Sequence, residues 1–463
     1  MFDSLIKVNI DWKIFLVVIL MIPLFFPYLS WFSFIAAVIT IHQFFLLFYS
    51  INYVIPIRYL FGTLMCLQMF VGPILAFNGF DKYQPYNYQM KVPEIEYFSF
   101  VIPAVALFIL GLHFKAGRLK GELWNINSIN KFANEHSHIP YLFIIIGFIS
   151  SFISEYFSGS GIKFFFYVVS NLKFVGAFML ILSDKKLKIL PLIIVAGSII
   201  SSSLAGGLFH DLIIWSIFLG TAFCIRFKPT SVIKLGFFIL FVLITIIIQQ
   251  LKGGYRSALL YQSQGIATLT KAYEKTEAQN ELFNLTSLAK SSIRINQGFI
   301  ITNIMKKVPN EVPFSNGAEL REILEAAFLP RILAPNKLKA GDQTIFTKYT
   351  GIQLGIGTTM GLSSVGDAYL NFGIFFGSIF MLSLGLLYNE VLKALYKYSK
   401  NFSILLIFTT VVFYFPIRPD SELQTNLGHL VKSLVIIFAV FTIWRRQLMS
   451  KDIPLISRDI ISK

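Results

Sequence analysis

Long apolar runs recur from one end of this chain to the other, and they restrict its possible folds more than any other feature. A helix needs about 20 apolar residues to cross the hydrocarbon core of a bilayer. Twelve runs near that length can be drawn, at residues 14–29, 31–49, 56–77, 96–113, 139–157, 162–182, 188–203, 210–225, 234–250, 365–388, 403–416 and 428–444. The sequence therefore predicts an all-α polytopic membrane protein of about 12 transmembrane helices with a large, partly helical external loop.

The composition supports this class. Hydrophobic residues make up 55% of the 463 residues and charged residues only 14%, whereas a soluble domain has about 25% charged residues. The two cysteines, Cys66 and Cys224, lie in apolar runs and indicate neither a disulfide framework nor a metal site. We attribute the net charge of +16 to basic loops facing anionic lipid. Membrane lipids, and no nucleic acid, are therefore the expected partners.

The connections between the runs alternate in character, which predicts the orientation. One set is rich in lysine and arginine and includes "SDKKLK", "RFKPTSVIK", "LKALYKYSK" and "RRQLMSK". Under the positive-inside rule these connections face the cytoplasm, and an even number of spans then places both termini there. The first apolar run lacks a small-residue cleavage site and leads into another span, so no cleavable signal peptide is expected.

The opposite set of connections includes one very long segment. Residues 1–250 are predicted to form a membrane domain with the first nine spans, 251–364 a large periplasmic loop, and 365–463 a membrane domain with the last three spans. A connection of this length is expected to fold on its own. Its stretch "NGAELREILEAAFLP" predicts an amphipathic helix with Asn316 as cap, and a second helix is predicted near 267–297.

Arginines in the predicted external segments are unexpected, because orientation gives no reason for them. They are Arg256, Arg294, Arg321, Arg331 and Arg418. A guanidinium is a planar, permanently charged fork that binds phosphate at two points. Convergence of Arg256, Arg331 and Arg418 at the membrane boundary would suit a lipid-linked pyrophosphate, with Arg294 as a fourth candidate. The alternative is that each arginine pairs with a nearby carboxylate or lipid phosphate, as we expect for Arg321.

Acidic residues and histidines near the same boundary are candidates for proton transfer. His210 follows "SLAGGLF", Asp367 opens the tenth apolar run, and Asp420 and Glu422 follow Arg418. An acid near the bilayer is costly to bury, and this cost often marks function. We take Asp367 and His210 as the candidate bases. The alternatives are a helix N-cap for Asp367 and an ion pair with Arg418 for Asp420.

Other motifs are absent or ambiguous. The stretch "DKYQPYNYQ" alternates tyrosines with amides, which suits stacking on sugars or an interfacial aromatic belt. The sequence has no Walker loop, dinucleotide fingerprint, zinc spacing or paired metal carboxylates. No cofactor and no metal are therefore predicted.

Several short segments together resemble the bacterial O-antigen or oligosaccharide repeat-unit polymerase family. These segments are "FLPRILAPNK", "GDAYLNFG" at the tenth apolar run, "KGGYRS" after the ninth, and "IRPDSE" before the last. The resemblance covers most of the chain, because the predicted topology with its late external loop also agrees with that family. It places Arg256 in a Gly-Gly-x-Arg-like loop, Arg331 in a Pro-Arg segment and Arg418 in the last external loop. Asp367 stands where the family has Glu as often as Asp.

The resemblance implies a fold and an activity. The fold would be the multi-spanning C-type (GT-C-like) glycosyltransferase architecture in the bacterial inner membrane. The enzyme would take a growing glycan from undecaprenyl pyrophosphate and transfer it to an incoming lipid-linked repeat unit. Family members are thought to need neither metal nor nucleotide, and a chain-length regulator is a possible partner. The arginines would stabilise the pyrophosphate leaving group, and Asp367 or His210 would accept a proton.

Two other functions remain open from the sequence. A lipid-linked oligosaccharide flippase, or another carrier, usually has repeated halves and charges within its spans, whereas here the charges gather outside. An O-antigen ligase depends on a histidine in the large loop, and residues 251–364 contain none.

Overall fold

The computed structural model of the chain describes most of its residues. These are residues 10–115, 121–157, 161–183, 187–206, 209–259, 268, 270, 273–274, 284–329, 333–334, 336–339, 341–355 and 358–449. The helices are α1 (Trp12–Phe25), α2 (Trp31–Ser50), α3 (Ile57–Cys66), α4 (Gly72–Leu75), α5 (Glu94–His113), α6 (Gly121–Glu135), α7 (Ile139–Tyr156), α8 (Gly161–Ser170), α9 (Leu172–Leu182), α10 (Ile189–Gly206), α11 (His210–Phe227), α12 (Ser231–Leu259), α14 (Leu285–Ser292), α15 (Gly298–Lys307), α16 (Ala318–Phe328), α17 (Gln343–Thr350), α18 (Ser363–Ser399), α19 (Leu405–Val412), α20 (Leu423–Ile443) and α21 (Arg445–Leu448). Shorter segments are the π-helices η1 (Leu67–Val71) and η2 (Ala76–Phe80) and the 3-10 turns η3 (Asp81–Tyr83), η4 (Tyr86–Tyr88) and η6 (Ile293–Ile295).

The described chain is helical throughout and contains no strand, which confirms the predicted fold class. Within the described residues, 9 helices are long and apolar enough to cross a membrane, and two shorter apolar helices lie at Trp12–Leu24 and Ile189–Ala205. The eleventh predicted run forms only the 8-residue helix α19, which is too short to span a bilayer of about 30 Å. Residues 403–414 around it are buried in protein, where irregular backbone is tolerated. The protein is an all-α polytopic membrane protein.

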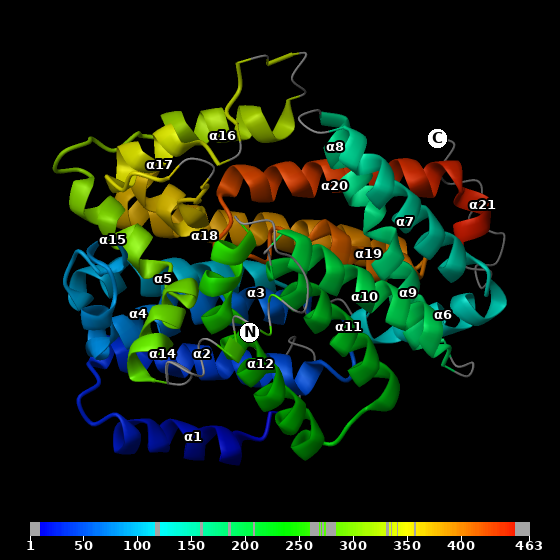
Figure 1. Ribbon diagram of the computed structural model, residues 1–463, viewed down its shortest axis with the longest axis horizontal. Coiled ribbons are helices and arrows are strands. Elements are labelled where there is room, and N and C mark those ends of the chain that lie inside the picture. Colours follow the sequence, from blue (N-terminus) through cyan, green and yellow to red (C-terminus); the bar gives the residue numbers. More distant parts are fainter. Residues whose placement is uncertain are drawn as a thin grey trace.

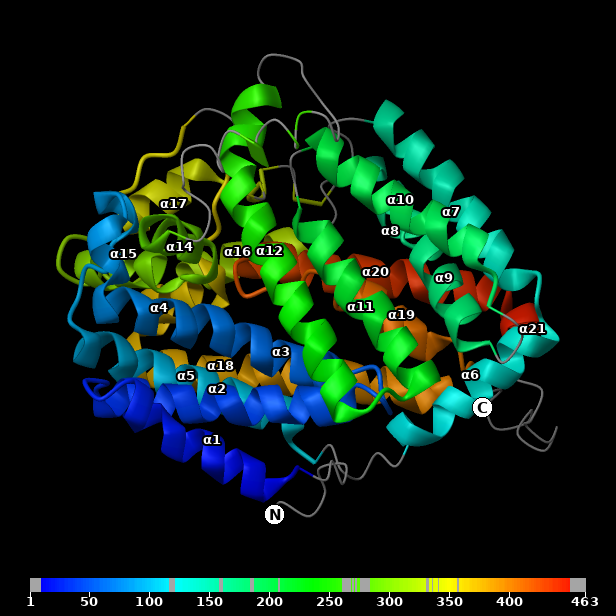
Figure 2. The same cartoon turned by 60° about the horizontal axis from the view of Figure 1, so that its bottom comes forward.

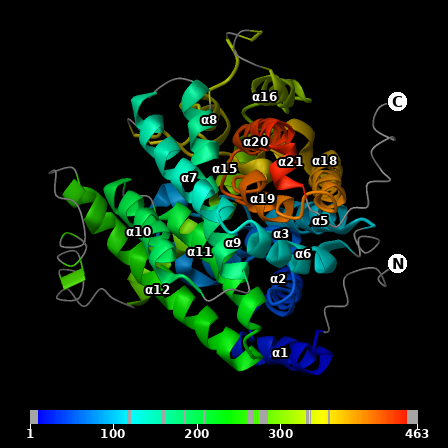
Figure 3. The same cartoon turned by 90° about the vertical axis from the view of Figure 1, so that its right-hand side faces the viewer.

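The helices form one elongated bundle. Helices α14, α15, α16 and α17 lie at one end, and α6 and α21 lie at the other (Figures 1 and 2). We call these the loop end and the opposite end. Seen along the bundle, α10, α11 and α12 group on one side and α2, α3, α5 and α18 on the other (Figure 3). Helix α12 leaves many apolar side chains exposed on its flank, as expected for a surface that faces lipid.

The contact between α5 and α18 is the most extensive between any two helices. Small residues permit this contact. A Cβ placed on Gly385 would lie 2.2 Å from the carbonyl oxygen of Phe108, and one on Gly111 would lie 2.5 Å from that of Leu382. Because lipid is as apolar as the helix surfaces, close backbone packing of this kind is the main attraction between membrane helices.

Helix α18 is broken near its start, and the break positions the candidate site. Gly373 has φ +67° and ψ −159°, a non-helical conformation. The first segment folds back on the second, so that a Cβ on Gly377 would lie 2.9 Å from the carbonyl oxygen of Ala368. Residues 363–371, which include Asp367, are all buried.

Helix α16 confirms the predicted amphipathic helix but not its predicted cap. Asn316 has φ +49° and forms no cap; the residue before the helix is Gly317, which has no side chain to cap with. Instead, Oδ1 of Asn371 on α18 accepts the N–H of Leu320 at 3.2 Å and the hydroxyl of Ser315 at 2.5 Å. The cap therefore comes from a distant helix, which local sequence cannot indicate.

Two further elements of the connections differ from expectation. Helix α14 covers only part of the helix predicted near 267–297, since it is followed by the 3-10 turn η6 and by non-helical residues 296–297. Helix α6 occupies a segment that the basic composition alone marks as a connection, and it packs against α9 and α18. At the loop end, α15 packs against α17 and α18, and α16 packs against α20. The helices of the long loop are therefore docked on the membrane bundle.

Candidate active site

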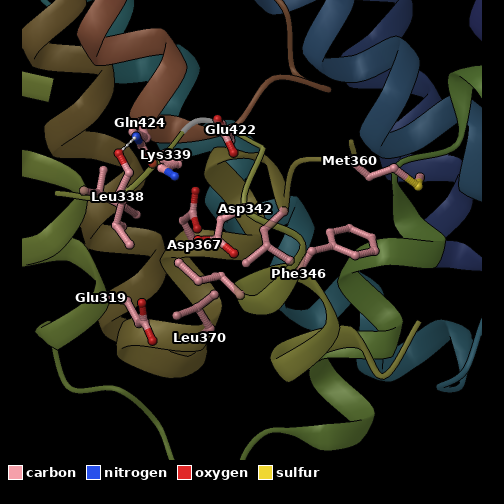
Figure 4. A pocket seen from close by; sticks show the side chains of 13 residues that line it. Glu319, Leu338, Lys339, Asp342, Phe346, Met360, Asp367, Leu370, Glu422 and Gln424 are labelled. Carbon is pink, nitrogen blue, oxygen red and sulfur yellow. Dashed lines mark hydrogen bonds between the residues drawn. The ribbon is translucent and has the colours of Figure 1, made fainter. Parts of the chain in front are cut away.

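Two adjacent cavities lie at the N-terminal end of α20. The larger, which we call the arginine cavity, has a volume of about 340 Å³ and a polar lining that includes Arg294, Gln297, Thr359, Arg418, Asp420, Ser421, Glu422 and Thr425. The smaller, which we call the carboxylate pocket, has a volume of about 30 Å³ and is lined by the polar residues Glu319, Lys339, Asp342, Asp367, Glu422 and Gln424 (Figure 4). Glu422 and Met360 line both, so the two spaces share a wall.

Arg418 lies in the turn between α19 and α20. Its guanidinium carbon lies 4.9 Å from the ring centroid of Phe415, and its Nη2 lies 3.9 Å from Oδ2 of Asp420. Within the described part of the chain, the buried Nε of Arg418 and Oδ1 of Asp420 have no hydrogen-bond partner. The contacts with Phe415 and Asp420 orient the guanidinium of Arg418. Because a guanidinium has five N–H donors, Arg418 still has donors to offer a ligand.

The carboxylate of Asp420 lies between two basic groups. Burial would by itself raise the pKa of Asp420, but the nearby charges of His210 and Arg418 outweigh this effect and lower the pKa below its usual value. His210 begins α11, and its neighbour Asp211 accepts a hydrogen bond of 2.5 Å from the hydroxyl of Tyr414. The start of α11 is therefore tied to the turn that carries Arg418.

Arg294 reaches the arginine cavity from η6, and the π-helix η1 anchors the backbone beside it. The N–H of Gly72 bonds to the carbonyl of Leu67, five residues back. This leaves the carbonyl of Gln68 to accept the N–H of Gln297 at 3.1 Å. Single π-helical turns are often found at functional sites, and here the turn frees the acceptor that fixes the segment carrying Arg294.

Two further contacts of η1 join the same elements. Gly72 has no side chain, and a Cβ there would lie 2.2 Å from the carbonyl oxygen of Ile295. The side-chain amide of Gln68 is one of the groups that lower the pKa of Asp420. Gln68 therefore holds the Arg294 side of the arginine cavity through its backbone carbonyl, and its amide acts on Asp420 of the Arg418 side.

The tyrosine-rich segment 81–89 braces the Arg294 wall from outside. Nε2 of Gln84 donates to the carbonyl of Ala289 and to the hydroxyl of Ser292, both at 3.2 Å. These two acceptors lie at the end of α14, just before Arg294. Stacking of these tyrosines on sugars remains a prediction.

Glu422 precedes α20 and is held through one oxygen. Its Oε1 accepts the N–H of Gly341 at 2.9 Å and the hydroxyl of Thr425 at 2.6 Å. Gly341 has φ +72°, a conformation that favours glycine. Burial raises the pKa of Glu422, the hydrogen bonds from Thr425 and Gly341 oppose this rise, and the negative charge of Asp342 adds to it.

Asp367 lines the carboxylate pocket and is only 5% exposed. Its Oδ2 accepts the N–H of Leu423 at 3.3 Å, so it caps α20 and not its own helix α18. Figure 4 shows its carboxyl group in the middle of the pocket, beside Asp342. The described residues contain no group of three or more His, Cys, Asp or Glu that could hold a metal ion.

The other acids of the pocket have identified partners. Glu319 accepts from Lys348 at 2.8 Å and from the hydroxyl of Tyr349 at 2.7 Å, so its ion pair is with Lys348. Oδ1 of Asp342 caps α17 by accepting the N–H of Thr344 at 2.8 Å.

The structure brings four of the six candidate site residues together. Arg294 and Arg418 line the arginine cavity, His210 acts on Asp420 in its wall, and Asp367 lies behind Glu422 in the adjoining pocket. Two candidates cannot be placed in this way. The side chain of Arg256, which belongs to α12, and the whole of Arg331 lie outside the described residues.

Several residues of this region escaped the sequence analysis. Gln68 carried a usable signal, because a polar residue inside an apolar run is costly in a membrane and often functional. Gln297 and Gly341 carried none, since each is important only through a backbone contact made with a distant segment. Asp342 and Lys339 could not be distinguished in the sequence from the other polar residues of the long loop.

The arrangement combines cationic forks with carboxylates around one cavity. Such a cavity can bind a phosphorylated group at the arginines and accept a proton at a carboxylate. Comparison of the chain with protein-family models, with curated proteins and with solved structures finds no match in any of the three.

Proposed function

We propose that this protein is a metal-independent glycosyltransferase that polymerises undecaprenyl-pyrophosphate-linked repeat units. It would transfer the growing glycan from its lipid carrier to an incoming lipid-linked unit at the periplasmic face of the bacterial inner membrane. The observation that carries the proposal is that Arg294 and Arg418, from distant parts of the sequence, line one cavity of about 340 Å³. The resemblance to O-antigen polymerases adds to it.

The chemistry of the leaving group explains why two arginines are needed. As the bond from the anomeric carbon to the pyrophosphate breaks, negative charge develops on the phosphate oxygens. Donors already fixed in position stabilise such charge without reorganisation. Arg418 is fixed by Phe415 and Asp420, and the backbone segment that carries Arg294 is held by the contacts of η1. The N-terminus of the 21-residue helix α20 adds the positive end of its dipole at the same place.

The proposal also specifies the setting of the enzyme. The basic connections put both termini in the cytoplasm and the arginine cavity on the periplasmic side, where flipped lipid-linked units arrive. A chain-length regulator would then meet the protein at the loop end.

The test uses purified protein in liposomes with undecaprenyl-pyrophosphate-linked repeat units from the host, EDTA and no nucleotide. Separation of the glycans by size should give a ladder of lengths. Arg294→Ala and Arg418→Ala should lose the ladder, whereas the control Arg321→Ala, on the exposed face of α16, should retain it. A single adduct on lipid A would identify a ligase instead. Movement of substrate across sealed vesicles without any new glycan would identify a carrier.

A further inference from the structure

The shared wall of the two cavities contains one carboxylate that the sequence did not single out as a base. Glu422 lines the arginine cavity and the carboxylate pocket, whereas Asp367 lines only the pocket. A base for the acceptor hydroxyl must lie within hydrogen-bond reach of that hydroxyl while the leaving group occupies the arginines. Position alone therefore favours Glu422 over Asp367.

The hydrogen bonds of Glu422 leave one oxygen available. Both bonds that the structure shows, from Gly341 and Thr425, end on Oε1. Its Oε2 has no hydrogen-bond partner among the described residues. The carboxylate is thus held in place on one side and offers a lone pair on the other.

The competing carboxylates are already engaged. Asp420 also lines the arginine cavity, but it faces Arg418 at 3.9 Å and the charge of His210, which hold it ionised as their counterion. Glu319 is paired with Lys348, and Asp342 caps α17. Burial also raises the pKa of Glu422, which makes it a better proton acceptor than an ordinary exposed glutamate.

We propose that Glu422 is the catalytic base that accepts the proton of the attacking hydroxyl, an inference that rests on the proposed polymerase function. The hydroxyl oxygen of the acceptor sugar forms a bond to the anomeric carbon of the donor, and its proton passes to Oε2 of Glu422. The bond from that carbon to the pyrophosphate breaks, and its electron pair leaves with undecaprenyl pyrophosphate, held by Arg294 and Arg418. Glu422 then releases the proton to water. A single displacement of this kind inverts the configuration at the anomeric carbon.

A structural role for Glu422 must be separated from a catalytic one, because its Oε1 also fastens the Gly341 loop to α20. The variant Glu422→Gln keeps an oxygen that can accept from Gly341 and Thr425 but cannot take up the proton at neutral pH. The matched variant Thr425→Val removes one fastening hydrogen bond and leaves the carboxylate. A purely structural role would make Thr425→Val as harmful as Glu422→Gln, and a catalytic role would not.

The experiment measures single-turnover elongation and donor binding on the full-length protein in liposomes. We expect Glu422→Gln to slow elongation by about 100-fold or more, with unchanged binding of labelled undecaprenyl-pyrophosphate-linked donor, and Thr425→Val to slow it by less than about 10-fold. We also expect the new linkage to have the inverted anomeric configuration.

Three results would overturn the inference, and they are distinguishable from failure of the proposed function. Elongation by Glu422→Gln within about 3-fold of wild type would exclude a base at this position. Equal losses in Glu422→Gln and Thr425→Val, with a lowered thermal midpoint in both, would assign a structural role. Retention of configuration would exclude the single displacement. Absence of elongation by the wild-type protein would instead refute the polymerase itself.

Discussion

Two arginines at opposite ends of the bundle, Arg58 and Arg418, have very different surroundings. Arg58, at the start of α3, is 4% exposed. Its Nε donates to the carbonyl of Leu112 at 2.9 Å, its Nη2 donates to Oδ1 of Asn389 at 2.9 Å, and its guanidinium stacks on Tyr396. Neutral acceptors that belong to the fold therefore use its donors, and no cavity is needed to explain it.

Arg418 presents the reverse situation. Its Nε has no partner in the described part of the chain, its ion pair with Asp420 is long at 3.9 Å, and it faces a cavity of about 340 Å³. A buried donor without a partner is costly, and a guanidinium that lines an open space can offer its other donors to a ligand. Arg58 and Arg418 therefore differ in their partners. These partners, and not the presence of an arginine in an apolar chain, distinguish a structural role from a binding role.

The largest expected effect is the loss of elongation rate when Arg418, at the loop end, is replaced. Arg418→Ala should lower the rate of glycan elongation by about 100- to 1,000-fold, because it removes a fixed donor to the developing phosphate charge. The thermal midpoint in detergent should change little, since among the described residues only Asp420 and Phe415 contact this guanidinium directly. A full-rate ladder from the folded variant would contradict the role of Arg418.

Replacement of Arg58, at the opposite end, should lower the stability of the protein and leave the elongation rate unchanged. Arg58→Ala leaves the carbonyl of Leu112 and the amide of Asn389 without their donor, which costs about 2–6 kcal/mol at about 1–3 kcal/mol for each buried group. We expect a clearly lower thermal midpoint and less folded protein in the membrane. The elongation rate per folded molecule should match the wild type, and a specific loss of rate would show that our division of the two arginines is wrong.

The smallest expected effect is a change in the pH dependence of elongation, which tests the role of Glu422 at the loop end. Burial raises the pKa of Glu422, and a base works only when ionised. Elongation should therefore be complete above this raised pKa and be lost as the pH falls through it, at a higher pH than for an exposed glutamate. The charged groups around Glu422 are Arg294, Glu319, Lys339, Asp342, Asp367, Arg418 and Asp420.

Neutralising one of these neighbours tests whether Glu422 is the group that titrates in the pH–rate profile. Asp342→Asn removes a negative charge that raises the pKa of Glu422 but keeps a side-chain oxygen to cap α17. The acid limb of the pH–rate profile should move to lower pH by less than about one unit. A profile that keeps its midpoint would place the titrating group elsewhere.

Much of the fold could be predicted from the sequence because the bilayer imposes a local rule. Every backbone polar group in hydrocarbon must be satisfied within its own helix, so a long apolar run such as 96–113 specifies a helix without reference to the rest of the chain. The amphipathic spacing of α16 is equally local. The same reasoning failed at the eleventh run, because surrounding protein could satisfy the irregular backbone on either side of α19.

The candidate site could be predicted only in part. The residue types that carry its chemistry, Arg294, Arg418 and the carboxylates after it, stand out from the sequence because charge is costly near lipid. Which of them meet was decided by contacts between segments far apart in the chain. These contacts include the N–H of Gln297 on the carbonyl of Gln68 and the Gly341 loop on Glu422.

The sequence by itself determined that the chain is a bundle of membrane helices with cationic and acidic residues gathered at their ends, because hydrophobicity and helical period act over neighbouring residues. Only the tertiary structure decided that Glu422, and not Asp367, lies between the two cavities. The kink at Gly373 folds the Asp367 segment back into the protein, where it caps α20. A carboxylate gains its role from the space it faces, and that space is formed by packing.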